Sequence, residues 1–488
     1  MTSRSLRNVS QKNVLFLLLL VMGALPSIAA DSPNATITTD PPRPNIVLIF
    51  ADDQGYGDLG CFGSQKIKTP NIDRLAKEGR RFTSFMVASP VCTPSRAALL
   101  TGCYPKRVGL HQHVLFPQSN KGLNPSEHTI ADHLKGLGYA TACFGKWHLG
   151  HHPETLPRQN GFDTYFGIPY SNDMNHPDNQ SKPRISSDDL WKDQQTAVTH
   201  WNTPLMENET IVELPVDQQT VTRRYTDRAI EFIRQNKEQP FFVYLPHTMP
   251  HIPLYVPDDA YDPDPQNAYT CVIEHIDAEV GRMIDTIRDL KLSDNTIVIY
   301  TSDNGPWLQF KNHGGSAGPL RAGKGTTFEG GQRVPCVMWA PGMIPAGTQC
   351  DELVGTIDLL PSIAALTESK LPSDRKIDGI DLSGLIVGRQ DTARREEFVY
   401  YTSHGEVEGI RQGNWKLLVK KKPANRQATS AEDTADPEVE RLLFDLSTDI
   451  GERNNLAAAH PEIVQALESQ MIAVDAEVEA NAREAWRK

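Results

Sequence analysis

The chain has 488 residues, a formal net charge of −12, and a composition of 39% hydrophobic and 23% charged residues. This length suffices for one large domain with a smaller companion, and the composition excludes a disordered or collagen-like chain. The acidic balance argues against a nucleic acid as partner, so an anionic substrate would have to be drawn by a local positive pocket.

The first 30 residues have the pattern of a secretory signal peptide. Three basic residues and no acidic ones come first, an apolar run over 14–25 follows, and Ala29 or Ala30 offers the cleavage point. This run is too short for a transmembrane helix, which needs about 20 apolar residues. We therefore expect a periplasmic or secreted protein without a membrane anchor, and a flexible lead-in over 31–44.

From residue 45 onward, apolar strand-like runs alternate with amphipathic helix-like stretches. The run at 45–50 is rich in β-branched residues and predicts a buried strand, whereas the long stretch at 269–290 predicts a helix. Such alternation predicts a mostly parallel sheet covered by helices on both faces. Further strands are expected at 81–87, 139–144, 241–245 and 296–300, and further helices at 72–78, 130–137 and 225–235.

Beyond residue 390 the pattern changes to short strand-like runs, which end in a helix-like tail from Pro461. We predict a large α/β domain over 45–390 and a small C-terminal α+β domain with an antiparallel sheet over 391–488. The acidic stretch at 423–439 is expected to be a mobile insert. The strand-like runs lie at 397–401, 415–420 and 442–446.

Cys92 lies at the predicted start of a short helix. Thr93 is expected to cap this helix, Pro94 suits its first turn, and Gly102 suits its end. A helix start offers free N–H groups and partial positive charge, and Arg96 adds a full charge one turn later, so an oxyanion would be held there. Taken alone, a cysteine at such a place is more often a half-buried structural residue.

Oxygen-bearing side chains follow two of the predicted strands. Asp52 and Asp53 come after the first strand, and Asp303 and Asn304 after a later one. In open α/β sheets, ligand-binding and catalytic residues lie at the carboxyl ends of the strands. Oxygen ligands suit Ca²⁺ or Mg²⁺ better than zinc, and the seven cysteines show no zinc spacing. Each pair alone would be ordinary turn usage, but together with Cys92 they predict a divalent cation that holds an anionic group.

Basic side chains also stand at loop positions. Lys146 and His148 follow a strand-like run two residues apart, so both can point into one cleft. Lys324 is the centre of a glycine-rich segment that lacks the pattern of a nucleotide P-loop. His247 and His251 lie in a proline-rich segment, and either could donate a proton near neutral pH. Taken singly, such a lysine is usually solvated and such a histidine merely hydrogen-bonded.

The segment Cys-Thr-Pro-Ser-Arg at 92–96 matches the Cys-x-Pro-Ser-Arg signature of the type I sulfatases, which depend on formylglycine. Nearly the whole chain resembles this family, and within it most closely arylsulfatase A and N-acetylgalactosamine-6-sulfatase. The resemblance implies an alkaline-phosphatase-like α/β fold, with a large mixed sheet sandwiched by helices and a smaller C-terminal domain of antiparallel sheet plus helix. The matching blocks, in family order, are 51–60, 69–73, 92–102, 145–150, 167–171, 301–305 and 321–331.

The resemblance also implies that Cys92 is oxidised to Cα-formylglycine. A formylglycine-generating or anaerobic sulfatase-maturing enzyme would be the partner in this step. The aldehyde hydrate would attack sulfur with one hydroxyl, and elimination would then release sulfate and restore the aldehyde. One Ca²⁺ is implied, with Asp52, Asp53, Asp303, Asn304 and the modified Cys92 as ligands.

The remaining site residues are carried over from the family motifs. By this resemblance Arg96 and Lys146 hold the hydrate, and Lys324 and Ser171 contact the sulfate. His148 would take the proton that triggers elimination. His251 would protonate the leaving alcohol, because it precedes an x-Pro step as the family histidine does, and His247 remains the alternative, from a position behind it.

These features predict a sulfuric ester hydrolase that acts on an aryl sulfate or a sulfated carbohydrate. One alternative is a formylglycine-dependent phosphonate or phosphate monoester hydrolase, because fold does not fix function. Another is a catalytically silent sulfoglycan-binding protein in which Cys92 is never oxidised. Substrate selection is expected in the segment 172–210, with Trp191 and Trp201, and in the C-terminal domain.

Overall fold

The computed structural model describes residues 43–174, 185–194, 200–392, 395–421 and 439–488. The predicted signal peptide, residues 31–42 of the expected lead-in, and all but the last residue of the insert expected at 423–439 lie outside these residues. Parts of the segment 172–210 lie outside them as well.

The site is built on an 11-stranded mixed sheet. The middle strands, in the order β9-β1-β8-β4-β5, all run parallel, so their carboxyl ends meet at one edge. The remaining strands extend the sheet beyond β9 and β5. The bounds are β1 (Asn45–Ala51), β2 (Arg80–Met86), β4 (Ala140–Phe144), β5 (Thr164–Gly167), β6 (Leu205–Glu207), β7 (Thr210–Glu213), β8 (Phe241–Pro246), β9 (Thr296–Ser302), β10 (Arg333–Trp339), β11 (Thr348–Cys350) and β12 (Val354–Gly355).

The expectation of a mostly parallel sheet is confirmed: the middle strands run parallel, β11 and β12 pair parallel with β2, and the antiparallel pairs lie towards the two sides. β10 runs antiparallel to β9 and to β2, and β6 and β7 run antiparallel beyond β5. The reason for β10 is its connection. Residues 303–332 contain no long crossover helix that would carry the chain back to the other edge, so the next strand starts where β9 ends and returns.

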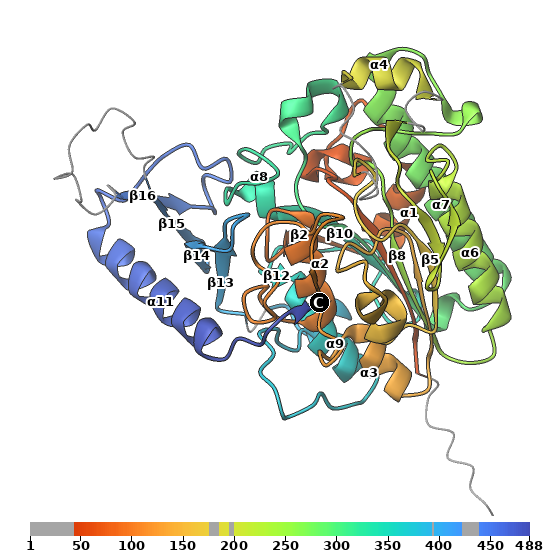
Figure 1. Ribbon diagram of the computed structural model, residues 1–488. Coiled ribbons are helices and arrows are strands. Elements are labelled where there is room, and N and C mark those ends of the chain that lie inside the picture. Colours follow the sequence, from red (N-terminus) through yellow and green to blue (C-terminus); the bar gives the residue numbers. More distant parts are fainter. Residues whose placement is uncertain (1–42, 175–184, 195–199, 393–394, 422–438) are drawn as a thin grey trace, which may run out of the picture. The chain divides into compact units, whose positions relative to one another are not determined.

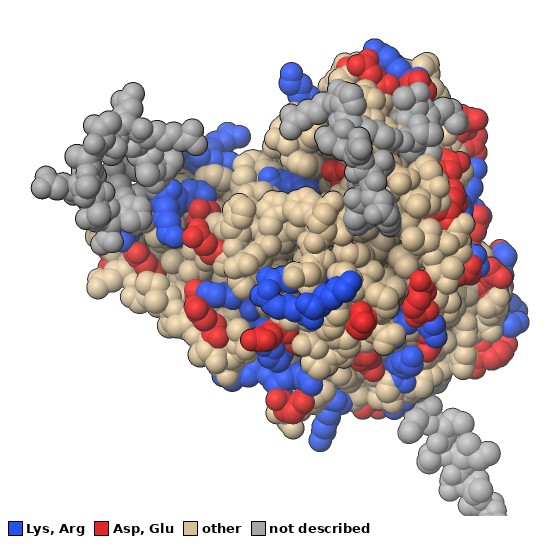
Figure 2. Space-filling model, viewed as in Figure 1, with Lys and Arg blue, Asp and Glu red and all other residues tan. Residues whose placement is uncertain are grey.

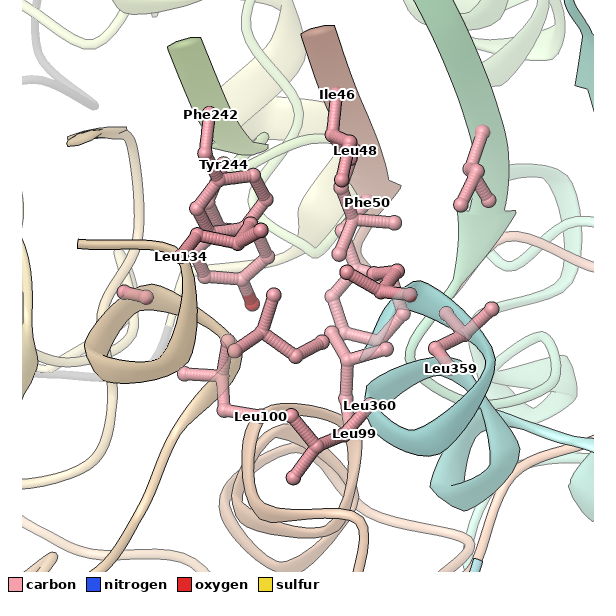
Figure 3. Close-up of a cluster of buried hydrophobic side chains, with 14 of the residues drawn as sticks. Ile46, Leu48, Phe50, Leu99, Leu100, Leu134, Phe242, Tyr244, Leu359 and Leu360 are labelled. Atoms are coloured by element: carbon pink, nitrogen blue, oxygen red, sulfur yellow. The ribbon is translucent and has the colours of Figure 1, made fainter. Parts of the chain in front are cut away.

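Helices cover both faces of this sheet (Figure 1). Side chains alternate along β1, so Ile46 and Phe50 belong to one core and Val47 and Ile49 to the other. Figure 3 shows the first core, in which leucines of α2, α3 and α9 pack against β1 and β8. The second core is formed with α1, α6 and α7. The helices are α1 (Pro70–Glu78), α2 (Cys92–Thr101), α3 (Ile130–Gly136), α4 (Ser187–Lys192), α6 (Val221–Gln235), α7 (Ala268–Asp289), α8 (Glu329–Gln332), α9 (Leu359–Leu366) and α10 (Ser383–Ile386).

The C-terminal part is a four-stranded antiparallel sheet with one long helix, as predicted. The sheet has the order β13 (Glu397–Tyr401), β14 (Val407–Gln412), β15 (Trp415–Lys421) and β16 (Val439–Asp445). Residues of α11 (Pro461–Ala480) share a core with this sheet and with Met86 and Ala98 of the larger part. A last short pair joins β17 (Trp486–Arg487) to β3 (Lys121–Gly122). The two parts thus share one core, and their expected limits at 390 and 391 stay predictions.

Across the described ranges, the helices are all too short or too polar to span a bilayer.

Candidate functional site

The eleven predicted site residues come together at the carboxyl edge of the parallel strands. Five strand ends supply most of them. Asp52 and Asp53 follow β1, Lys146 and His148 follow β4, and Ser171 follows β5. His251 follows β8, and Asp303 and Asn304 follow β9. The start of α2 adds Cys92 and Arg96, and the segment before α8 adds Lys324. Convergence at this edge is what the topology of an open parallel sheet dictates.

Cys92 lies in the middle of this group. Its Sγ is 3.4 Å from Asp52 Oδ1 and 3.7 Å from both Lys146 Nζ and Lys324 Nζ. Burial, with smaller effects of Asp303 and Asp52, raises the pKa of the thiol well above its usual value. As a thiol, Cys92 is therefore protonated and a poor nucleophile at neutral pH, although two ammonium groups lie beside it.

Asp52 is the carboxylate that pairs with two of the buried basic side chains. Its carboxylate pairs with the Lys146 ammonium, and Arg96 Nη2 lies 3.2 Å from Asp52 Oδ2. Burial raises the pKa of Asp52, but Lys146 and then Arg96 outweigh burial and hold this pKa below its usual range. Lys146 Nζ also donates to Ser171 Oγ at 3.1 Å, so the Ser171 hydroxyl lies beside the same ammonium.

Asp53 and Asn304 have unmet capacity for a cation. Burial raises the pKa of Asp53 to about 7, even though Lys324 Nζ lies 2.7 Å from the carboxylate. Asn304 is fully buried; its amide nitrogen donates to Asp53 Oδ1 at 2.7 Å, and its amide oxygen has no partner among the described residues. Exchanging the two amide atoms, which are nearly alike in shape, would turn that oxygen towards the carboxylates.

Ligand atoms of Asp52, Asp53, Cys92 and His251 all lie within 4.8 Å of one another. Asp303 borders this group, since its Oδ1 accepts from the Asp53 N–H at 3.0 Å. The donor set consists of carboxylates, an amide oxygen without a partner and position 92, which suits a hard divalent cation such as Ca²⁺. The residues present therefore fit the implied metal.

Arg96 fixes α2 against the sheet, but Thr93 does not cap the helix as expected. Arg96 Nε and Nη2 both donate to Asp303 Oδ2, at 3.1 and 2.8 Å. The expected cap of α2 by Thr93 is absent, because the helix begins at Cys92 itself, with Val91 at the cap position and no side-chain cap. The Thr93 hydroxyl instead donates to the His148 carbonyl at 2.9 Å and accepts the Leu115 N–H at 3.0 Å. Long-range partners outcompete a local cap here.

His148 is held as a neutral imidazole with one free nitrogen. Its Nε2 lies 2.9 Å from the Leu115 carbonyl, so this nitrogen carries the proton, and Nδ1 has no partner among the described residues. Burial, followed by Lys146 and Arg96, lowers the pKa of His148 well below its usual value. A buried, unprotonated Nδ1 beside the site can accept a proton.

Of the two candidate histidines, His251 lies at the site and His247 does not. His251 Nε2 is 3.6 Å from Asp53 Oδ2, and its Nδ1 bonds the Ile252 carbonyl. Burial and the two lysines lower the pKa of His251. His247 is buried, neither of its ring nitrogens has a hydrogen-bond partner among the described residues, and burial, followed by His275, lowers its pKa to about 3. His251 is therefore the histidine within reach of a group bound at these carboxylates.

Sequence reasoning missed two residues that border the site. Trp307 lies under both Lys324, whose Nζ is 4.2 Å from the ring centroid, and His251. The sequence could have indicated Trp307, because it stands three residues after the predicted metal ligand Asn304. Leu115 acts only through its backbone, which no side-chain pattern reveals. Trp191, expected near a substrate, is only 1% exposed and bonds the Asp262 carbonyl, so it packs.

Positive charge that could attract an anion lies inside the site. Lys146 and Arg96 are fully buried, and the Lys324 side chain is 8% exposed. On the face seen in Figure 2, basic and acidic side chains are interspersed. Electrostatic selection of a substrate therefore takes place at short range, where the local dielectric is low.

Comparison with known proteins identifies matching families over most of the chain. A family model described as Sulfatase matches residues 44–369, and one described as the C-terminal region of aryl-sulfatase matches residues 393–485. Arylsulfatase A from Homo sapiens is 40% identical over 446 residues, which are 87% of this chain and 86% of that protein. N-acetylgalactosamine-6-sulfatase from Sus scrofa is 36% identical over 459 residues, 88% of this chain and 85% of that protein.

Solved structures share the fold. A Bacteroides thetaiotaomicron protein, from work on the metabolism of multiple glycosaminoglycans, has a TM-score of 0.75 at 29% identity, covering 88% of this chain and 99% of its own. Ps i-CgsB in complex with a neocarrahexaose has a TM-score of 0.73 at 29% identity, covering 91% and 94%. The phosphonate monoester hydrolase of Agrobacterium radiobacter has a TM-score of 0.60 at 19% identity, covering 89% and 96%.

Proposed function

This chain belongs to the sulfatase family and is a sulfuric ester hydrolase, and we propose that it works through a Cα-formylglycine at position 92 and one Ca²⁺. The observation that carries this proposal is the setting of Cys92, between two lysine ammonium groups and beside three buried aspartates. A thiol gains little from this setting, because burial keeps it protonated. A hydroxyl group at the same position would lie beside the lysines, which can bind an anion, and beside the aspartates, which can bind a cation.

Oxidised to Cα-formylglycine, position 92 would supply a hydrate hydroxyl as the nucleophile for sulfur. Lys146 and Arg96 would hold this hydrate, because the Lys146 ammonium lies 3.7 Å from Cys92 Sγ and the Arg96 guanidinium contacts Asp52, the carboxylate beside Cys92. Lys324 and Ser171 would bind the sulfate oxygens, since the Lys324 ammonium lies 3.7 Å from Cys92 Sγ and the Ser171 hydroxyl contacts Lys146, which lies equally close to Cys92. The Lys324 ammonium would then exchange part of its contact with Asp53 for the anion.

A Ca²⁺ held by Asp52, Asp53, Asp303, Asn304 and position 92 would neutralise the carboxylates and polarise the bound sulfate. Two observations support this role: the amide oxygen of Asn304 has no partner within the described part of the chain, and the pKa of Asp53 is raised. His148 Nδ1 would accept a proton from the hydrate, because Leu115 fixes its tautomer. His251 Nε2 would donate a proton to the departing alcohol, once the negative charge of the sulfate favours its protonated form.

We infer that the natural substrate is a sulfated glycan. The names of two relatives support this class: one is N-acetylgalactosamine-6-sulfatase, and another was crystallised with a neocarrahexaose. We further propose that the protein is exported by a signal peptide at 1–30. Its catalytic domain would span 45–390 and its C-terminal domain 391–488.

Mass spectrometry of the peptide that contains residues 90–96 tests the proposed modification. Conversion of the thiol to an aldehyde lowers the peptide mass by about 18 Da. Cys92→Ser should keep its affinity for the sulfated substrate but lose turnover, because an ordinary hydroxyl cannot release sulfate by elimination. An unmodified Cys92 in active enzyme, or a Cys92→Ser variant as fast as wild type, would overturn the mechanism.

A phosphonate or phosphate monoester hydrolase remains the second candidate, supported by the shared fold of the Agrobacterium enzyme. Parallel assays on an aryl sulfate and an aryl phosphonate separate the two functions. We expect faster turnover of the sulfate ester, and faster phosphonate turnover would reverse the assignment. A protein that binds sulfated glycans yet carries an unoxidised Cys92 and turns over neither ester would be the silent binding protein.

A further inference from the structure

The segment that carries Lys324 leads directly into α8, and the backbone of α8 supports the site. The Gly331 carbonyl of α8 accepts the Gly305 N–H at 3.0 Å, next to Asn304 in the chain. The Lys324 N–H in turn donates to the Pro306 carbonyl at 2.9 Å. A displacement of α8 would therefore move Lys324 relative to the carboxylates.

Glu329, the first residue of α8, is held from the C-terminal sheet. It is fully buried, and its Oε1 accepts hydrogen bonds from the Tyr400 hydroxyl on β13 and from Lys416 Nζ on β15, both at 2.9 Å. Its backbone N–H donates to Glu452 Oε2 at 2.7 Å, and Lys416 Nζ lies 2.9 Å from Glu452 Oε1. Although burial raises the pKa of Glu329, Lys416 and then Arg333 hold it below its usual range. The Lys416 ammonium therefore bridges two buried glutamates.

A second attachment lies two residues earlier. The Thr327 hydroxyl donates to the carboxylate of Glu408 on β14, and Lys420 Nζ on β15 donates to the same carboxylate at 2.6 Å. Lys420 Nζ also lies 5.0 Å from the centroid of the Phe328 ring. Residues 327–329 are thus bound, one after another, by side chains of the C-terminal sheet.

We propose that Lys416 and Glu408 are positioning residues through which the C-terminal sheet fixes Lys324 in the sulfate site. This inference rests on the proposed role of Lys324 in binding sulfate. Without Lys416, Glu452 loses the ammonium that lies 2.9 Å from it, and Glu329 keeps the more distant Arg333 and Arg411, at 3.3 and 3.9 Å. Breaking a buried ion pair by removing one partner is strongly unfavourable. α8 would shift to relieve this, so Lys324 would be present but displaced from the anion.

Lys416→Met tests this role, because it keeps the length of the side chain and removes its charge. The measurements are KM and kcat for an aryl sulfate and the inhibition constant of inorganic sulfate, taken well below the melting temperature of the variant. We expect KM and the sulfate inhibition constant to rise by about tenfold or more, as for other residues that support a site from behind.

Arg395→Met is the matched control. The Arg395 guanidinium pairs with Asp358, and both side chains are nearly buried, at 6% and 1% exposed. This pair also joins the C-terminal part to the larger part, but among the described residues it makes no contact with α8. We expect a lower melting temperature and an unchanged sulfate inhibition constant. The comparison separates loss of stability from loss of positioning.

An unchanged inhibition constant in Lys416→Met, or an equal rise in Arg395→Met, would overturn the inference. If Lys416→Met does not fold, Glu408→Leu gives the same test at a partly exposed residue, and an unchanged constant there would also overturn it. Failure of the proposed function has a different signature: the wild-type enzyme itself would neither hydrolyse an aryl sulfate nor be inhibited by sulfate.

Discussion

Asp52 and Asp53 are neighbours in sequence, yet their surroundings affect their carboxyl groups in opposite ways. For Asp52, Lys146 and Arg96 outweigh burial and lower its pKa. For Asp53, burial outweighs the nearby Lys324, and its pKa rises to about 7. The site thus lacks positive charge at Asp53 rather than at Asp52. A divalent cation would supply that charge, which makes the local electrostatics an argument for a metal.

His247 leads to a prediction about acid stability. It is fully buried without a hydrogen-bond partner among the described residues, and burial, then His275, lowers its pKa to about 3, against about 6.5 for an unfolded chain. Above pH 6.5 both states are neutral. Between pH 6.5 and about 3 only the unfolded chain takes up this proton, so stability falls as the pH falls.

His247→Gln should therefore reduce the loss of unfolding free energy between pH 7 and pH 5 by about 2 kcal/mol. Urea titrations of the wild type and the variant at both pH values measure this difference. His404→Gln, at an exposed position, is the control and should keep the wild-type pH dependence. A His247→Gln variant as acid-sensitive as the wild type would contradict the prediction.

At the scale of elements, the turn after β4 aims Lys146 and His148 at the site. Gly145 has a φ of +139°, a conformation that side chains rarely allow, and a Cβ there would lie 1.9 Å from the Pro246 carbonyl oxygen. The same carbonyl accepts the Lys146 N–H at 2.8 Å. The close approach of the β4 and β8 ends therefore sets the position of Lys146.

Gly145→Ala should lower kcat/KM for an aryl sulfate by about 100-fold, because a displacement of Lys146 by about 1 Å misplaces a group at the reacting centre. Gly138→Ala is the matched control: Gly138 also has a positive φ, of +87°, but nothing lies within 4 Å of the Cβ position. This control should lose about 1 kcal/mol of stability and keep its activity. Equal activity of the two variants would show that the contact does not position Lys146.

At the scale of the whole molecule, a chain with a net charge of −12 gathers buried basic side chains and buried carboxylates at one edge of the sheet. The carboxylates come from two segments far apart in the sequence, after β1 and after β9. A cation bound there joins segments that are about 250 residues apart, as the Asp53–Asp303 hydrogen bond does. Its binding energy should therefore add to the stability of the folded chain.

Removal of calcium should lower the melting temperature by a few degrees, because a ligand present at 100 times its Kd stabilises the folded state by about 2.7 kcal/mol. Thermal scans with excess Ca²⁺ and with a chelator measure the shift, and activity should be lost in the chelated sample. In Asp53→Asn the shift should be much smaller, since one ligand charge is gone. A wild type with the same melting temperature in both conditions would argue against the site.

The amino-acid sequence by itself determined the alternation of strands and helices and most of the residues that meet at the site. Local hydrophobic periodicity specifies each element, and strands that run parallel must deliver their carboxyl ends to one edge, so Asp52, Lys146 and Asp303 could be predicted to meet. Only the tertiary structure decided how distant segments pair. In the folded chain β10 runs antiparallel to β9, and the Thr93 hydroxyl bonds the His148 carbonyl instead of capping its helix. His251, rather than His247, lies beside Asp53. The fold also pairs Glu329 with Lys416. Each of these depends on partners far away in the chain, and burial and hydrogen bonding between such partners leave no local pattern in the sequence.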